Sequence, residues 1–380
     1  MQTLTTPAVP ARPDDWQAWI AYGMAWAAQP APATTPPTPP RPETPARAAG
    51  TRCLELTAYR EDVPGPRWQA LHRATWRAYR AWYLADGMEA RPGLVEARDA
   101  LARHMPELVP TWHRLVELAG HDPIAARLLT MWRLPTFAAG CSQLVLDAAP
   151  GDPLLVRNYD YDPLLFEGVV ATTNYSGRRR VLGTSDLLWG LLDGMNSDGL
   201  TVSLTYGGRP ARPDDAPGFA IPLVLRYLLE TCADVPEATA TLRRLPIAQA
   251  YNLALVDTRG GHASVFVAPG EQPVVSALRA TTNHRLERVE HPHAADRLDS
   301  PQRQRVLLSA LDGPADPAAV TDLFLRPPLR REAYRAGFGT LYTAAYRPAR
   351  GEVTYLWPGT AWRRHFEDGQ DGIRAWVNEM

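Results

Sequence analysis

Large apolar residues recur at three- and four-residue spacing from Arg67 to about Arg133. This spacing places them on one face of an α-helix. We therefore predict helices for WQALHRATWRAYRAWYLA and VEARDALARHMPELVPTWHRLVELAG, with Gly120 as the C-terminal cap of the second. Residues 51–140 are expected to be mostly helical.

The pattern changes at Gly140, where short segments rich in β-forming residues alternate with Gly, Pro, Asp and Asn. The first predicted strands are CSQLVLDA, PLLVRNYD, GVVATTNY, RRRVLGTS and LTVSLTYG. Two helices, IPLVLRYLLETC and PEATATLRRL, precede further strands in AYNLALVDTRG, HASVFVAPG and VVSALRATTNH. The segment TLYTAAYRPARGEVTYLWP reads as a hairpin that turns at PARG. Runs of strands separated by runs of helices predict an α+β layered fold, with residues 141–380 as its main domain.

A proline-rich stretch, QPAPATTPPTPPRPETP, lies near the N-terminus. Proline lacks the backbone N–H that helices and sheets need, so residues 1–50 are expected to be an extended extension outside the fold. The amphipathic piece from Trp16 to Ala28 is either a docking helix or part of a poorly ordered tail.

Charge and composition narrow the class of protein. The 380 residues carry a formal net charge of -1, which indicates neither a nucleic-acid partner nor an anionic membrane. We find no run of 18 apolar residues and expect no signal peptide. The three cysteines make neither a disulfide framework nor a C-x-x-C zinc motif. We therefore expect a cytoplasmic protein without a bound metal.

One cysteine, Cys141 in AAGCSQLVLD, lies in a setting that suggests chemistry. A lone cysteine is more often a small buried apolar residue. Here it follows Gly140, which reaches the strained backbone that a peptide bond attacked by the next side chain requires.

The segment RNYDYDP follows 16 to 22 residues beyond Cys141. A strand, the GDP turn and a returning strand would bring Arg157 and Asp160 back beside the cysteine. An arginine and a carboxylate there would hold a thiolate and an ammonium in place. The alternative is a surface Arg–Asp pair that contributes little.

Asparagines recur near predicted strand ends in GMNSDGLTVSL, YNLALVD and TTNHRLE. A side-chain amide at a strand end can donate to a developing oxyanion. The alternative is that these asparagines cap turns.

Taken in this order, GCS, RNYDYDP, GMNSDGL, YNLALVD, TTNH and TLYTAAY resemble the penicillin-type acyltransferases, the C45 peptidases of the N-terminal-nucleophile superfamily. They are more distantly similar to choloylglycine hydrolases and acid-ceramidase-like amidases. The resemblance runs from about residue 60 to residue 366. It implies a four-layer αββα sandwich and self-cleavage between Gly140 and Cys141. Residues 1–140 and 141–380 would then stay associated as two fragments.

The resemblance also implies roles for individual residues. Cys141 matches the family nucleophile, Arg157 and Asp160 match the residues that flank it, and Asn252 matches an oxyanion-hole asparagine. Further residues with substrate-facing or supporting roles would be Asn283, His284 and Arg285, the last near an arginine of some bile-salt hydrolases. Relatives usually have an asparagine where this chain has Thr205 or Tyr206.

The resemblance implies an autoproteolytically activated hydrolase or acyltransferase, acting through an acyl-cysteine on linear amides or acyl thioesters such as acyl-CoA. The freed α-amine of Cys141, with an ordinary pKa of about 7.7–8.0, would serve as general base, and no cofactor is needed. One alternative pairs Cys141 with His284 as a thiol–imidazole couple that needs no chain cleavage. Another is a family member that has lost catalysis and binds a small amide or lipid.

Overall fold

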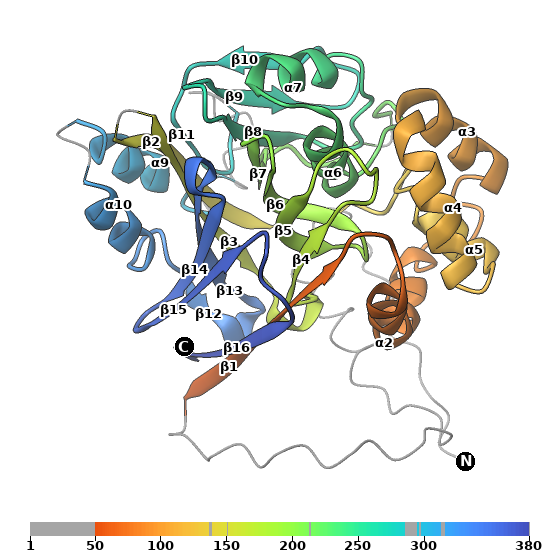
Figure 1. Ribbon diagram of the computed structural model, residues 1–380, viewed down its shortest axis with the longest axis horizontal. Helices are drawn as coiled ribbons and strands as arrows, with labels where there is room; N and C mark the ends of the chain where they lie inside the picture. Colours follow the sequence, from red (N-terminus) through yellow and green to blue (C-terminus); the bar gives the residue numbers. More distant parts are fainter. Residues whose placement is uncertain are drawn as a thin grey trace.

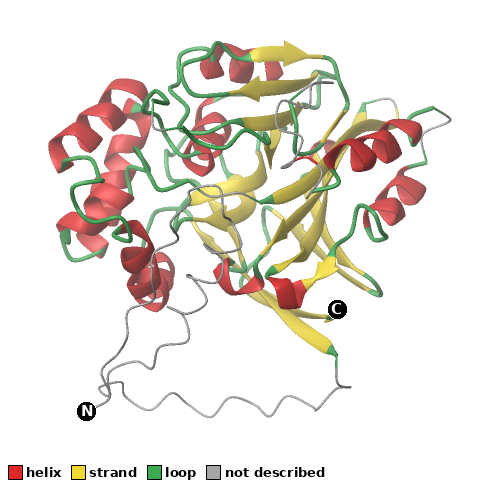
Figure 2. Cartoon of the chain, turned by 180° about the vertical axis from the view of Figure 1, so that it is seen from behind, coloured by secondary structure: helices red, strands yellow, loops and turns green. Residues whose placement is uncertain are grey.

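The computed structural model describes residues 50–136, 139–149, 151–212, 214–285, 295, 298–312 and 316–379. The proline-rich extension and the segment from Trp16 to Ala28 lie outside the described residues. Two β-sheets form the centre of the molecule, and Figures 1 and 2 show them from opposite sides.

The larger sheet has nine strands in the order β10-β9-β8-β7-β6-β5-β4-β1-β16. Its strands are β1 (Thr51–Glu61), β4 (Val169–Thr173), β5 (Val181–Asp186), β6 (Gly190–Asn196), β7 (Thr201–Tyr206), β8 (Tyr251–Val256), β9 (His262–Val267), β10 (Val274–Ser276) and β16 (Asp371–Asn378). The smaller sheet has seven strands, in the order β11-β2-β3-β13-β14-β15 with β12 paired to β13. Its strands are β2 (Gly140–Ala149), β3 (Asp152–Tyr161), β11 (Ala280–Thr281), β12 (Glu332–Ala333), β13 (Phe338–Arg347), β14 (Glu352–Trp357) and β15 (Thr360–His365).

Helices cover the outer face of each sheet. α6 (Ile221–Thr231) and α7 (Val235–Leu242) pack on the nine-stranded sheet, whereas α9 (Ser300–Ser309) and α10 (Pro317–Phe324) pack on the seven-stranded one. The inner faces meet where β2 contacts β7 and β8. These four layers confirm the predicted αββα sandwich (Figure 1).

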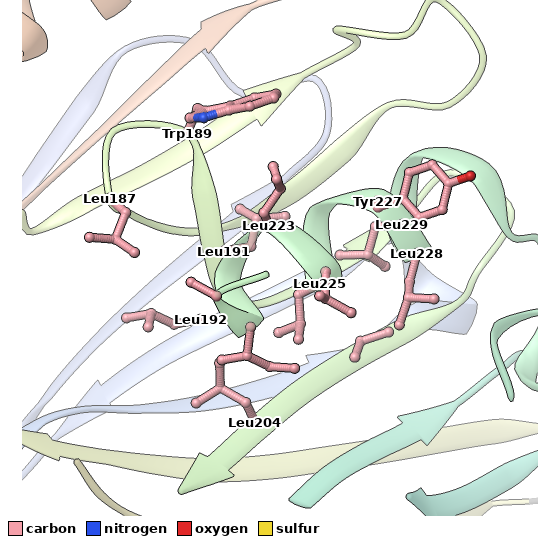
Figure 3. Close-up of a cluster of buried hydrophobic side chains, with 14 of the residues drawn as sticks. Leu187, Trp189, Leu191, Leu192, Leu204, Leu223, Leu225, Tyr227, Leu228 and Leu229 are labelled. Atoms are coloured by element: carbon pink, nitrogen blue, oxygen red, sulfur yellow. The ribbon is translucent and has the colours of Figure 1, made fainter. Parts of the chain in front are cut away.

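The core of the larger sheet is rich in leucine. Figure 3 draws the apolar side chains of α6 together with Leu191 and Leu192 of β6, all of them almost completely buried. Burying one such side chain contributes about 1.5–3 kcal/mol. This layer therefore holds α6 firmly on the sheet, in line with the helix predicted for IPLVLRYLLETC.

The helices predicted before Cys141 are present, although the structure divides the second of them at residues 105–108, and they gather at one side of the sheets (Figures 1 and 2). They are α2 (Pro66–Tyr83), α3 (Leu94–His104), α4 (Val109–Leu118) and α5 (Pro123–Leu128). Gly120 follows α4 with φ of 73°, and the next amide, of His121, donates to the Val116 carbonyl. The predicted glycine cap is therefore confirmed.

The main departure from the sequence-based prediction is β1, an 11-residue strand within the segment expected to be mostly helical. Leu54, Leu56 and Ala58 are buried in alternation, the period of a strand. β1 pairs in parallel with β4 and antiparallel with β16. The nine-stranded sheet thus combines strands from both sides of the Gly140–Cys141 bond.

A second departure concerns VVSALRATTNH, which was predicted as one strand. The structure divides it between β10 in the larger sheet and β11 in the smaller one. The segment crosses from one layer to the other, which periodicity along the chain does not reveal. This crossing leads directly into Asn283 at the candidate site.

Candidate active site

Cys141 is the second residue of β2, and its side chain is completely buried. The turn at Gly151 returns the chain as β3, so that Cys141 lies opposite Tyr159 and Gly140 opposite Asp160. The predicted returning strand is therefore confirmed. The hairpin brings Arg157 and Asp160 to the cysteine.

Arg157 contacts the thiol, and its guanidinium lies next to aromatic rings. Its Nη2 lies 3.2 Å from the Sγ of Cys141, and its Nη1 lies 2.5 Å from Oδ2 of Asp193. Asp193 also accepts hydrogen bonds of 2.6 Å from the hydroxyls of Tyr342 and Tyr346. Arg157 and Asp160 have no exposed surface, so the alternative of a surface Arg–Asp pair is wrong, and the carboxylate that Arg157 contacts is that of Asp193.

Burial raises the pKa of the Cys141 thiol to about 11, and the positive charge of Arg157 opposes this shift. The thiol is therefore protonated at neutral pH in the uncleaved chain. Any attack by sulfur must be accompanied by proton transfer, since the thiolate is the nucleophilic form.

Both ends of the Asn283 side-chain amide form hydrogen bonds to the backbone near Cys141. Its Oδ1 accepts from the backbone N–H of Cys141 at 2.9 Å and from Nη2 of Arg303 at 2.6 Å. Its Nδ2 donates to the carbonyls of Tyr206 at 3.0 Å and Ala139 at 3.3 Å. Two donors face the oxygen and two acceptors face the nitrogen, which determines the orientation of the amide.

Arg303 on α9 is a site residue that the sequence analysis missed. Its Nη1 lies 2.9 Å from the carbonyl oxygen of Cys141, 2.9 Å from Oγ of Ser142 and 3.3 Å from Oδ2 of Asp160. Burial lowers the pKa of Arg303 to about 10, so the guanidinium stays charged at neutral pH. The sequence carried one signal for Arg303. It lies four residues before Leu307, so that both residues share the buried face of the helix.

Asp160 completes the polar cluster across from Gly140. Its Oδ1 accepts from Oγ1 of Thr340 at 2.7 Å, and its Oδ2 faces Arg303 and Arg331. Burial raises the pKa of this carboxyl, and the two arginines oppose that shift.

Asn252 and Thr205 act on the segment that carries Asn283. Nδ2 of Asn252 donates to the carbonyls of Thr282 and His284, both at 2.8 Å. Oγ1 of Thr205 donates to the same Thr282 carbonyl at 2.8 Å. In the uncleaved chain, therefore, backbone carbonyls accept both amide hydrogens of Asn252.

His284 and Arg285 have other partners. Nδ1 of His284 lies 2.8 Å from Oγ of Ser300, whereas Nη1 of Arg285 lies 2.5 Å from the carboxylate of the half-exposed Glu271. The arginine that contacts the Cys141 backbone is Arg303.

Gly140 is required for a different reason from the one predicted from the sequence. Its φ lies outside the left-handed region, so the backbone there is not one that only glycine adopts. A Cβ at this position would lie 2.4 Å from Cζ of Phe338 and 3.2 Å from Cβ of Asp160. The close approach of Phe338 is what excludes a side chain.

Asp193 is the second residue that sequence reasoning missed. It lies in the middle of β6, in the run GLLDGMN, where every residue is buried. A carboxylate within such a run must have partners, since burying an unpaired charge is costly. This was the only sequence signal for it.

The burial of His284 predicts a pH dependence of stability. Burial lowers its pKa below the ordinary 6.5, so below about pH 6.5 the unfolded chain binds the proton more readily than the folded one. Stability therefore falls as pH drops from about 7 through this window. We expect His284→Asn to flatten the dependence of the melting temperature on pH between 7.5 and 5.5. The exposed His113→Asn is the control, and equal slopes for wild type and His284→Asn would contradict the prediction.

Comparison with known proteins places the chain in a family context. Residues 148–362, just over half of the chain, match the sequence pattern of the family described as acyl-coenzyme A:6-aminopenicillanic acid acyl-transferase. The match begins after Cys141, so it does not itself include the cysteine. A comparison with curated protein sequences gave no match.

Several solved structures are similar to this one. A mutant of the conjugated bile acid hydrolase of Clostridium perfringens has 13% identity, a TM-score of 0.42, and coverage of 63% of this chain and 97% of its own. Penicillin V acylase from Agrobacterium tumefaciens has 15% identity, a TM-score of 0.39, and coverage of 59% and 84%. The Caenorhabditis elegans ortholog of N-acylethanolamine-hydrolyzing acid amidase has 16% identity, a TM-score of 0.41, and coverage of 55% and 93%.

No helix among the described residues has the length and apolar character needed to cross a bilayer. Within the same residues, no group of three or more His, Cys, Asp or Glu side chains could hold a metal ion.

Proposed function

Because the chain belongs to the acyl-coenzyme A:6-aminopenicillanic acid acyltransferase family, we propose that it is a self-activating N-terminal-cysteine enzyme. Its substrates are linear amides or acyl thioesters, and Cys141 carries the acyl group. The observation that supports this most directly is the buried thiol beside Asn283, which holds the Cys141 N–H and the Ala139 carbonyl on either side of Gly140. A cysteine that served only as core would not need these polar partners.

In the first step, the Sγ of Cys141 attacks the carbonyl carbon of Gly140. A bond forms between sulfur and carbon, the bond from that carbon to the Cys141 nitrogen breaks, and the thiol proton moves to the departing amine. Water then cleaves the thioester and returns a proton to sulfur. Arg157, 3.2 Å from Sγ, stabilises the developing negative charge on sulfur.

After cleavage, the nitrogen that Asn283 now binds as an amide is the free α-amine of Cys141. With an ordinary pKa near 8 it takes the thiol proton at neutral pH. Oδ1 of Asn283 keeps this amine beside its own thiol. Asp160, opposite Gly140 in the register, is close enough to the new chain end to favour its protonated state during the reaction.

An oxyanion formed at the position of the Gly140 carbonyl would need hydrogen-bond donors there. Nδ2 of Asn283 now donates to the Ala139 carbonyl, one peptide before that position, and becomes free to contact the acyl group of a substrate once Ala139 departs. Asn252 and Thr205 then act as positioning residues, because they hold Thr282 and His284 on either side of Asn283. His284, bound to Ser300, belongs to the same supporting group.

The two fragments would stay together after cleavage. β1 is hydrogen-bonded on both edges, to β4 and to β16, and both of those strands belong to the 141–380 fragment. Trp68 of α2 donates to the Leu188 carbonyl and is completely buried. Separation of the fragments would expose this surface to water.

The test is an acyl-enzyme measurement on the wild-type protein. Purified protein is incubated with a short series of acyl p-nitroanilides and acyl thioesters, quenched in acid, and its mass is recorded under denaturing conditions. We expect a 141–380 fragment carrying one acyl group, with the label on Cys141 after peptide mapping. A fully cleaved protein that takes up no acyl group from any probe would contradict the proposed activity.

A further inference from the structure

The uncleaved chain already shows what lies around an acyl group at this site. In self-cleavage, the acyl group that passes to Sγ is the Gly140 carbonyl with its α-carbon and the chain before it. The acyl-enzyme formed from a substrate has the same thioester linkage to the same sulfur. The surroundings of Ala139 and Gly140 are therefore a template for the acyl subsite.

The subsite is narrow at the α-carbon. A Cβ built on Gly140 in the L configuration would lie 2.4 Å from Cζ and 3.1 Å from Cε1 of Phe338. It would also lie 3.2 Å from Cβ of Asp160. Contacts below 3.0 Å force a neighbour to move, and here the neighbour is an aromatic ring.

The ring of Phe338 is held in place on several sides. Phe338 is the first residue of β13, pairs with Ala333 of β12, and is only 8% exposed. The guanidinium of Arg331 lies over its ring, 5.3 Å from the centroid. Arg331 is itself anchored to Asp299 at 2.9 Å. The ring cannot easily swing aside.

We propose that Phe338 is a specificity-determining residue that limits the enzyme to acyl groups with an unsubstituted α-carbon, such as straight-chain acyl or glycyl groups. The ring of Phe338 fills the space that an L-configured α-substituent would occupy. This inference rests on the proposed function, because it assumes that Cys141 carries the acyl group of a substrate. It adds which acyl groups are accepted and which side chain rejects the others.

Self-cleavage supplies the first test, because it uses the acyl group of the chain itself. We expect Gly140→Ala to slow cleavage about 10- to 100-fold, because the free-energy cost of overpacking a closed site is added to the activation barrier. The double variant Gly140→Ala/Phe338→Ala should recover at least tenfold. Gly369→Ala is the matched control, because a Cβ there meets no atom within 4 Å. Cleavage of Gly140→Ala at the wild-type rate, or no recovery in a folded double variant, overturns the inference.

The second test uses external acyl groups that copy Ala139–Gly140. Wild type and Phe338→Ala are treated with the benzyl thioesters of N-acetylglycine, N-acetyl-L-alanine and N-acetyl-D-alanine, and acylation of Cys141 is followed by mass. In wild type we expect the L-alanyl group to react at least tenfold more slowly than glycyl. Phe338→Ala should reduce that ratio at least tenfold while changing the D-alanyl to glycyl ratio less than threefold.

The outcomes separate the two proposals. If the wild-type chain neither cleaves itself nor accepts an acyl group, the proposed function fails and this inference falls with it. If it cleaves itself and accepts other acyl groups but not N-acetylglycyl, the acyl subsite lies elsewhere and only this inference fails. Equal rates for the glycyl and L-alanyl thioesters in wild type would overturn it in the same way.

Discussion

Cys141→Ala is expected to remain a single chain of 42.0 kDa under conditions in which the wild-type protein separates into residues 1–140 and 141–380. Alanine removes the sulfur that, in the proposed mechanism, attacks the Gly140 carbonyl. Activity on amides or thioesters should fall by about four to six orders of magnitude, as when other enzymes lose a nucleophile. Denaturing intact-mass measurement and initial rates on the same samples check both parts.

The other two cysteines provide the controls. Cys53 lies half-buried on β1, and Cys232 lies buried at the end of α6. Their alanine variants should cleave and react as wild type does. Cleavage of Cys141→Ala at the Gly140–Cys141 bond would show that another group performs it. An uncleaved wild-type protein with full activity would instead favour the reading without chain cleavage.

Asp193→Asn is expected to lower the free energy of unfolding by about 3–5 kcal/mol, since it leaves the buried Arg157 charge without its partner. The hydroxyls of Tyr342 and Tyr346 also lose a charged acceptor. Urea unfolding followed by circular dichroism measures the change. Because Arg157 holds the thiol, we also expect slower self-cleavage in the variant that has remained folded.

Asp198→Asn is the matched control for this charge effect. Asp198 pairs with Arg179 at 2.6 Å, but its side chain is 40% exposed. An exposed pair contributes about 0–1 kcal/mol, so this variant should unfold nearly as wild type does. Equal destabilisation by the two variants would mean that burial of the Arg157–Asp193 pair is not what makes it important.

The two variants address different parts of one arrangement. In the proposed mechanism Cys141 supplies the reacting atom, whereas Asp193 acts only through Arg157, which in turn contacts the sulfur. A charge buried in this way is stabilising only while its whole network is satisfied. We therefore expect the site to be sensitive to changes in β6, a strand on the opposite sheet from Cys141.

Features that depend only on neighbours along the chain could be predicted from the sequence. Helical spacing predicted α2 to α4, and the GDP turn at residues 151–153 predicted that β3 returns beside β2. The placement of Arg157 and Asp160 beside Cys141 followed from that hairpin alone. Local periodicity carries this information because side-chain spacing within one element sets which residues share a face.

The distant residues that complete the site could be identified only from the way the layers pack. Arg303 contacts the carbonyl of Cys141 across 162 positions of sequence, and Asn283 reaches its amide across 142. The sequence could not distinguish the roles of Asn252 and Asn283. The structure does, because β8 packs against residues 282–284: Asn252 supports this segment, whereas Asn283 contacts the backbone N–H of Cys141.

The reason is that a long-range contact depends on how layers stack, and a single sequence records only the preference of each layer. β1 shows the same limit, because its short alternating segment becomes part of a sheet only through the strands on either side of it, β4 and β16, which are distant in the sequence. Gly140 is the sharpest case. The sequence indicated that a glycine was needed there, but the cause is the ring of Phe338, which β13 brings to it from the far end of the chain.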